Sequence, residues 1–203
     1  MPTLQDLLQK ADSCKQKIAS ARPPEDCREA AGHGAAYDFM LELARQPDMD
    51  ITEDIIRNLH RLLYQKADTG QAGQYRTIEA GLSGTGHIPP SPEDIPRLMN
   101  HLADQIHSSR STLHPIELAA MAHKRLVDIS PFADGNGRTA WLLMNLILVN
   151  AGYGVASVPP IRRDDYDEAL SASRRLLNME PFSKLIAECV VESEQDLFRR
   201  LQP

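Results

Sequence analysis

A short glycine-rich segment carries the residues best suited to chemistry. From residue 130 to residue 138 the sequence reads Ser-Pro-Phe-Ala-Asp-Gly-Asn-Gly-Arg. Gly135 and Gly137 permit backbone angles that other residues avoid, and Asn136 between them tolerates left-handed geometry. Successive amides in such a turn converge into a nest that binds anions, and a helix N-terminus behind the nest adds its dipole. The segment therefore predicts a phosphate site.

Two charged residues of the segment fit the same ligand. A cation in the first turn of a helix is disfavoured by about 0.3–1 kcal/mol, so Arg138 is natural there if a negative group shares the space. Asp134 can hold Mg²⁺, which takes one or two carboxylates plus phosphate oxygens and water. Phe132 is apolar within a polar loop and predicts an anchor in the core. The alternative is a glycine turn with an Asp–Arg ion pair and no ligand, but the whole combination favours the phosphate site.

Two apolar helices must position this loop. Pro115 in a first turn predicts a helix to about Ile129. Pro131 ends that helix and biases Ser130 towards an extended conformation. Residues 138–149 are apolar on nearly all sides, which predicts a buried central helix.

Helical periodicity dominates the rest of the chain. Thr52 is a typical N-cap, and Ser91-Pro92 is a second start signal. Further helices are expected around residues 4–11, 27–45, 53–63, 165–177 and 181–201. The exception is Gly73 to Pro90, which is rich in glycine, and residues 76–82 within it predict one arm of a short hairpin. The alternatives are a plain linker and a flap over a site.

Composition limits the classes of partner. The chain has 203 residues, 42% hydrophobic and 25% charged, with a formal net charge of −6. A broad nucleic-acid or anionic-membrane surface requires a basic stripe, so neither partner is expected. Cys14, Cys27 and Cys189 have no metal-ligand spacing and are expected to be reduced thiols of a cytoplasmic protein. No signal peptide is recognised at Met1, and the longest apolar run, residues 141–149, is too short to span a bilayer.

The glycine-rich segment resembles the Fic (Fido) signature, which reads His-x-Phe-x-Asp/Glu-Gly-Asn-Gly-Arg-x-x-Arg. The resemblance runs from about Ile51 to the C-terminus. Over this stretch the sequence is similar to animal and bacterial Fic AMP-transferases. It includes, in family order, Ala72–Arg76, His87–Pro90, His114-Pro115, Arg138–Asn145, Ala151–Tyr153, Tyr166 and Pro181-Phe182. It implies an all-α, Fic-type helical bundle with a short β-hairpin flap. Residues 49–203 would form the Fic domain, and the helices of residues 1–48 would pack on its core.

Fic proteins mostly transfer AMP from ATP to a Ser, Thr or Tyr hydroxyl of a target protein. The resemblance implies that Asp134 binds Mg²⁺ and that Arg138 neutralises phosphate charge. Gly135, Asn136 and Gly137 would cradle the α- and β-phosphates. A flap from Thr77 to His87 would align the target segment by strand-like pairing. Its docking residues would be Thr77, Ile78, Gly84 and His87.

Two signature positions depart from the family. Ser130 replaces the histidine that acts as general base, a role worth about 10²–10⁴-fold in rate. Trp141 replaces the second arginine, which holds the γ-phosphate, and its indole offers one donor and no charge. A third absence fits these two. Residues 20–25 lack the spacing of the inhibitory helix that many Fic proteins carry, which leaves a separate inhibitor chain as the alternative.

Other side chains near the motif have a structural and a functional interpretation. His123 is expected in the core and His114 as a helix cap. His87 would reach the site only if the flap closes deeply. Arg162 and Arg163 are expected as a solvated pair, with nucleotide contact as the alternative, and Tyr75 and Arg76 are expected to brace the flap.

Two functions therefore remain. One is a slow Fic nucleotidyltransferase, and the other is a pseudoenzyme that binds a nucleotide, or a protein at the flap, without turnover. An engineered substitution at Ser130 is a third explanation, although it leaves Trp141 unexplained. The sequence leaves the target, the transferred group and a homo-oligomer open.

Overall fold

The computed structural model describes residues 2–19, 34–47, 49–65, 68–80 and 87–201. Within these residues the secondary structure is helical, with no β-strand. The α-helices, in chain order, are α1 Leu4–Ala19, α2 Gly34–Ala44, α3 Glu53–Tyr64, α4 Ile95–Ser109, α5 Pro115–Ile129, α6 Asn136–Asn150, α7 Arg163–Arg175 and α8 Glu180–Leu201. Two short 3-10 helices, η2 Pro92–Asp94 and η3 Pro160–Arg162, lead into α4 and α7.

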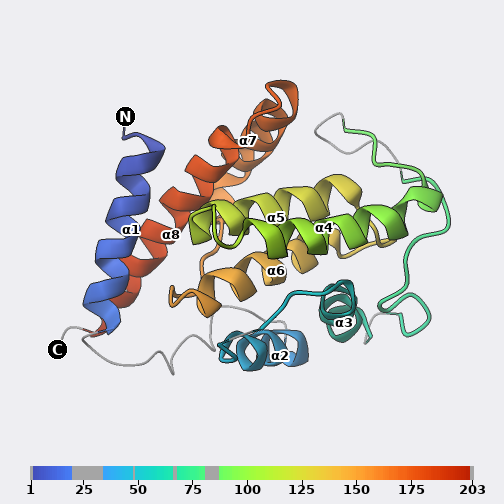
Figure 1. The fold of residues 1–203 in the computed structure, drawn as a ribbon, viewed down its shortest axis with the longest axis horizontal. Coiled ribbons are helices and arrows are strands. Elements are labelled where there is room, and N and C mark those ends of the chain that lie inside the picture. Colours follow the sequence, from blue (N-terminus) through green and yellow to red (C-terminus); the bar gives the residue numbers. More distant parts are fainter. Residues whose placement is uncertain (1, 20–33, 48, 66–67, 81–86, 202–203) are drawn as a thin grey trace.

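Helix α6 is the centre of the molecule. Every residue from 142 to 148 is buried, which confirms the buried helix predicted from its apolar sequence. It packs against α5, α2 and α3, while α4 covers α5 from the other side (Figure 1). Asn145 is fully buried, and its side chain bonds the backbone of Ala156 in both directions, with N–O distances of 2.8 and 3.0 Å. The segment after α6 is thereby held against the helix that it follows.

Local capping chemistry starts the helices that flank the site. The Thr52 hydroxyl accepts from the Ile55 N–H at 3.4 Å. His114 Nδ1 accepts from the Ile116 N–H at 3.2 Å, and Glu117 accepts from the His114 N–H at 3.3 Å. Both caps agree with the sequence-based expectation, and the second is a reciprocal capping box.

The two N-terminal helices join the core at different places. Helix α1 packs on α8 and helix α2 on α6 and α3 (Figure 1). Asp12 fastens α1, because Tyr153 Oη donates to its carboxylate and His114 Nε2 lies 3.3 Å from it. Partial burial acts to raise the pKa of Asp12, but the hydrogen bonds from Tyr153 and His114 and the nearby positive charge together lower it.

The predicted hairpin flap is not seen in the described residues. Residues 76–80 form bends and irregular chain instead of a strand arm, and residues 87–90 are also irregular. A strand requires a ladder partner, whereas the Arg76 N–H donates to Pro131 O in the motif loop at 2.9 Å. Gly84 lies outside the described residues, as does the start of the helix expected from residue 27.

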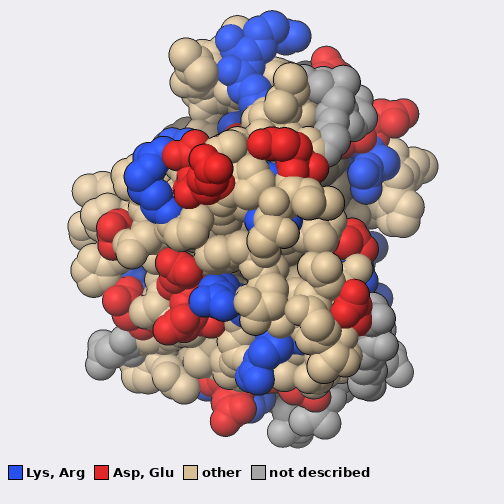
Figure 2. Space-filling model, turned by 90° about the vertical axis from the view of Figure 1, so that its right-hand side faces the viewer, with Lys and Arg blue, Asp and Glu red and all other residues tan. Residues whose placement is uncertain are grey.

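No described helix has the length and apolar character needed to cross a bilayer. On the face drawn in Figure 2, acidic and basic side chains of the described residues are interspersed. That face therefore carries charge of both signs side by side.

Candidate functional site

The motif loop begins at Ser130, which ends α5 in a left-handed conformation with φ 44° and ψ 60°. The extended conformation expected from the following proline is therefore wrong. Two bonds explain the difference: the Ser130 N–H donates to Leu126 O at 2.9 Å, and its hydroxyl donates to Val127 O at 2.7 Å. A left-handed residue that closes a helix in this way satisfies carbonyls that would otherwise lack partners.

Asn136 braces the loop through its side chain. Its Oδ1 accepts from the Phe132 N–H at 2.9 Å, and its Nδ2 donates to Phe132 O at 2.8 Å. Phe132 is 1% exposed, so the apolar residue of the loop does lie in the core. The Asn136 amide group is therefore used inside the loop, and its backbone N–H at the start of α6 is the group left for a ligand.

His60, on α3, contacts the motif loop through its ring. This residue was not identified from the sequence. Its Nδ1 accepts from the Gly73 N–H at 2.9 Å, so Nε2 carries the proton and donates to Asp134 O at 3.1 Å. The ring stacks on Phe132 with centroids 3.7 Å apart. Burial lowers the pKa of His60 and keeps the ring neutral. The only sequence signal was its place beside Leu59 in the apolar stripe of α3.

The two glycines of the loop have different roles. Gly135 has φ 78°, and a Cβ on it would lie 3.2 Å from His60 Nε2. Gly137 has ordinary helical geometry in the first turn of α6, so the expected turn conformation is wrong for this residue. Apart from its chain neighbours and the backbone of its own helix, no described atom lies within 4 Å of a Cβ built on Gly137, and the residue lines a pocket. Its missing side chain leaves room above the helix N-terminus.

Asp134 and Arg138 form an ion pair, with Asp134 Oδ2 and Arg138 Nη2 3.3 Å apart. Such a pair is what the sequence predicts under the alternative of a glycine turn without a ligand. The pair is loose and largely open to solvent, since the two side chains are 68% and 46% exposed. Tyr64 Oη also lies 3.4 Å from the Asp134 carboxylate. Both charges therefore lie beside the N-terminus of α6, where a phosphate would meet them.

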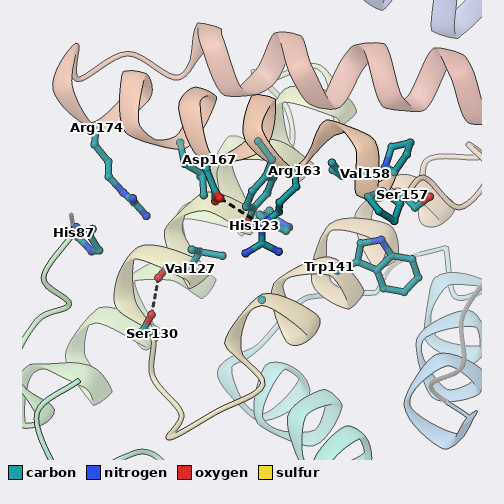
Figure 3. Close-up of a pocket in the computed structure, with 15 residues that line it drawn as sticks. His87, His123, Val127, Ser130, Trp141, Ser157, Val158, Arg163, Asp167 and Arg174 are labelled. Carbon is teal, nitrogen blue, oxygen red and sulfur yellow. Dashed lines mark hydrogen bonds and ion pairs between the residues drawn. The ribbon is translucent and has the colours of Figure 1, made fainter. Parts of the chain in front are cut away.

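A pocket of about 610 Å³ opens above the loop, between α5, α6 and α7 (Figure 3). Ser130 and Gly137 line it on the motif side, and Trp141 of α6 forms another wall together with residues 157–160, which follow that helix. The α7 side contributes Arg163, Tyr166, Asp167, Leu170 and Arg174. The pocket therefore extends from the motif loop to a partly apolar wall that includes Val158 and Leu170.

Trp141 stands where the Fic signature has its second arginine, and its aromatic ring forms part of the pocket wall. Its indole stacks on Tyr37 of α2 with centroids 6.4 Å apart and planes 20° apart. Figure 3 shows the ring beside Ser157 and Val158. An aromatic ring at this position contributes packing instead of a positive charge.

His123 forms the back of the pocket and is a core residue, as expected. It is 4% exposed, and its Nε2 lies 2.9 Å from Tyr166 Oη. Burial lowers the pKa of His123 to about 4, against smaller raising effects from the Ala140 backbone and the Asp128 charge. The ring is therefore neutral near pH 7 and enclosed.

The two arginines before α7 are not one solvated pair. Arg162 is only 19% exposed and is bound to Glu188 at 2.5 Å and Asp165 at 3.1 Å. Arg163 is 74% exposed and lines the pocket, with Asp167 3.4 Å away. The expectation of a solvated pair is wrong for Arg162 because carboxylates of α7 and α8 surround it.

The described residues on either side of the flap, 77–80 and 87–90, lie near the motif loop. His87 lines the same pocket as Ser130, with its Nε2 2.8 Å from Asp128 O, so it reaches the site without any deep closure. Arg76 is 4% exposed and bonded to the motif loop, and Tyr75 Oη donates to Glu53 at 2.8 Å. Thr77 is exposed and Ile78 is 70% exposed, so both are accessible to a partner.

The residues present fit a magnesium ion bound together with a phosphate. Asp134 supplies one exposed carboxylate at the loop. No group of three His, Cys, Asp or Glu that could hold a metal occurs in the described part of the chain. Since Mg²⁺ is satisfied by one carboxylate, phosphate oxygens and water, the ion would require the nucleotide as a co-ligand.

Comparison with known proteins places this geometry in a family. The Fic/DOC family model matches residues 50–148. The chain is 39% identical over 162 residues to the protein adenylyltransferase Fic of Nematostella vectensis, covering 79% of this chain and 37% of that protein. It spans about a third of the length of the curated relatives that it matches.

Solved structures agree in fold. A Fic-domain-containing signaling protein from Bacteroides thetaiotaomicron superposes with a TM-score of 0.74 at 28% identity, covering 83% of this chain and 70% of that one. Fic-1 from C. elegans superposes with a TM-score of 0.77 at 24% identity, covering 98% and 72%, a likeness that shows the fold. With its motif loop between two buried helices, this chain belongs to the Fic/DOC family.

Proposed function

We propose that the chain binds the phosphates of ATP at its motif loop and is a Fic-type adenylyltransferase with impaired transfer. The observation that carries this proposal is the open N-terminus of α6. Gly137 leaves room above it, and Asp134 and Arg138 flank it. Backbone amides, helix dipole and guanidinium converge there on one anion. Relatives named protein adenylyltransferase support the choice of AMP transfer.

Each residue has a distinct part in this proposal. The backbone amides of residues 135–137 and the Arg138 guanidinium bind the α- and β-phosphates. Asp134 holds Mg²⁺, which when bound supplies charge neutralisation to the phosphates. Asn136 and His60 keep the loop in shape through the bonds that they make to Phe132 and Asp134. A target hydroxyl approaches from the exposed flap residues Thr77 and Ile78.

Transfer is impaired because the hydroxyl proton has no acceptor at residue 130. When the hydroxyl oxygen bonds to the α-phosphorus and the bond to pyrophosphate breaks, that proton has to leave. The Ser130 hydroxyl is itself a donor, bonded to Val127 O at 2.7 Å. Loss of a general base costs about 10²–10⁴-fold in rate, so slow turnover is expected.

Labelled ATP tests the proposal directly. We expect slow Mg²⁺-dependent labelling of the protein itself or of lysate proteins, and faster labelling by the Ser130→His, Trp141→Arg double variant. Asp134→Ala serves as the control and should abolish both signals. Labelling that survives Asp134→Ala would come from a contaminant and would contradict the proposal.

The second candidate is a pseudoenzyme that binds nucleotide without turnover. The same Ser130–Val127 bond favours it, because the hydroxyl faces a backbone acceptor at the end of α5. A silent wild type together with an active double variant would support this candidate. Calorimetry with ADP would then show binding without labelling.

A further inference from the structure

The carbonyl groups at the C-terminal end of α5 each have a partner, and the last two, of Asp128 and Ile129, have partners in His87 and Arg76. We use "flap ends" for residues 77–80 and 87–90. The last four carbonyls of a helix have no intrahelical partner. Ser130 satisfies the first two through its N–H to Leu126 O and its hydroxyl to Val127 O.

The carbonyls of residues 128–131 accept hydrogen bonds from His87 and Arg76, which lie at the two ends of the flap segment. His87 Nε2 lies 2.8 Å from Asp128 O, and since a carbonyl only accepts, this nitrogen carries the proton. Arg76 Nε donates to Ser130 O at 2.8 Å, and its Nη2 reaches Ile129 O at 3.5 Å. The Arg76 N–H donates to Pro131 O at 2.9 Å. The carbonyls from 128 to 131 are therefore bound by two residues that border the flap.

The same guanidinium also holds both flap ends. Arg76 Nη1 donates to Ile78 O at 3.0 Å, and Nη2 donates to Pro90 O at 2.5 Å. The side chain is 4% exposed, and burial lowers the pKa of the guanidinium, although arginine stays charged in proteins. A planar fork with fixed donor directions binds several carbonyls at once, which a lysine ammonium does not reproduce.

We propose that Arg76 is a positioning residue that holds the flap ends and the motif loop in one register, so that nucleotide binding at the loop restrains both flap ends. This inference rests on the proposed function for the identity of the ligand, but the contacts exist without it. Phosphate on the amides of residues 135–137 restrains the chain that includes Ser130 and Pro131. Arg76 transmits that restraint to Ile78 and Pro90 through one rigid group. Coupling of this kind has an observable, the protection of flap amides.

Hydrogen exchange of the full chain, with and without Mg-ADP, tests the inference. In wild type we expect Mg-ADP to slow exchange in residues 130–134 and in both flap ends. In Arg76→Lys it should still slow the loop but no longer slow the flap ends. If Mg-ADP slows the flap ends of Arg76→Lys by the same factor as in wild type, Arg76 has only a structural role and the inference is overturned.

The matched control is Arg57→Lys. Arg57 also donates to a backbone carbonyl, Gly73 O at 3.1 Å, but among the described residues it makes no hydrogen bond to the flap ends or the motif loop. Its substitution should leave the response of the flap to Mg-ADP unchanged. If Arg57→Lys abolished the Mg-ADP protection of the flap ends as fully as Arg76→Lys, the role proposed for Arg76 would not be specific to it.

The measurement without nucleotide separates this inference from the proposed function. Absence of any Mg-ADP protection in wild type would count against the proposed function alone. Without ligand, Arg76→Lys should raise exchange in residues 130–134 and in both flap ends by a common factor of about tenfold, the scale of losing one to two hydrogen bonds. A rise confined to one of the two segments would overturn the inference.

A second variant keeps Arg76 in place in case Arg76→Lys does not fold. Pro90→Gly loosens the flap end that accepts from Nη2. Because coupling between two sites is reciprocal, this change should weaken Mg-ADP binding about threefold or more. Trp141, the single tryptophan of the chain, lines the pocket and reports binding by fluorescence. An unchanged Kd in Pro90→Gly would argue against coupling through Arg76.

Discussion

At the scale of single residues, Gly135 and Gly137 are glycines for different physical reasons. Gly135 occupies the left-handed region at φ 78°, against the His60 ring. Gly137 is helical and faces open space in the pocket. The first glycine therefore serves the fold, whereas the second keeps room for a ligand.

Alanine at each glycine separates these roles. We expect Gly135→Ala to lower the free energy of unfolding by about 1–3 kcal/mol, because a Cβ is strained at this φ and crowds His60. Gly137→Ala should leave stability unchanged or raise it by up to about 1 kcal/mol, since alanine is the better helix former. Its methyl group should nevertheless abolish Mg-ADP binding. Urea unfolding and calorimetry measure the two quantities, and normal ADP binding by Gly137→Ala would contradict the proposed phosphate position.

We expect Trp141 to determine whether the pocket distinguishes ATP from ADP. The wild type should bind ADP about as well as ATP, because the ring stacks on Tyr37 and carries no charge for the γ-phosphate. Trp141→Arg should favour ATP over ADP by about ten- to hundredfold, the effect of a hydrogen bond to a charged group. Trp141→Phe keeps an uncharged ring and should show no preference. Calorimetry with both nucleotides checks this, and a strong ATP preference in wild type would contradict it.

At the scale of elements, the motif loop depends on one side chain that caps its own turn. Asn136→Ala removes both bonds to the Phe132 backbone, at 2.9 and 2.8 Å. We expect a loss of about 1–3 kcal/mol in the free energy of unfolding, because the Phe132 N–H and C=O lose their partners. Mg-ADP binding should weaken as the loop relaxes. Asn58→Ala, at a surface bond to Arg61, is the control and should change neither quantity.

Elements whose signals are local could be predicted from the sequence. Thr52, and Pro115 with Glu117, mark helix starts because cap, proline and acid act within one turn. The hairpin arm predicted over residues 76–82 was wrong for its described part, residues 76–80, since the backbone partner of Arg76 lies in the motif loop, far away in the sequence. Ser130 was predicted as extended because the proline effect is also local, yet the capping bonds to α5 outweigh it. His60 was missed because its ring meets Gly73 and Asp134 only in the folded chain.

At the scale of the whole molecule, a few ionisable groups buried between helices link folding to pH. His123 of α5 contacts Tyr166 of α7 and Phe182 of α8. Glu194 of α8 is 1% exposed and accepts from the Gly154 N–H at 2.5 Å, and burial raises its pKa. Raising the pKa of a carboxyl group destabilises the folded state as pH rises above about 4.5, whereas lowering the pKa of a histidine destabilises it as pH falls. The two groups therefore have opposite effects on the pH dependence of stability, and a substitution that tests one of them must leave the other unchanged.

His123 gives the acid side of this balance a definite pH window. Its pKa is about 4 in the folded chain and about 6.5 when unfolded, so the unfolded chain binds the extra proton between these values. Stability from the neutral ring is complete above about pH 6.5 and should fall towards pH 4 by up to about 1.4 kcal/mol per pH unit. Urea unfolding between pH 7.5 and 4.5, at steps of about one pH unit, measures this slope. His123→Gln should flatten it whatever its absolute stability, because Glu194 and His60 are the same in both proteins. His101→Gln, on the exposed side of α4, should keep the wild-type slope, and an equally steep slope in His123→Gln would show that His123 does not link folding to pH.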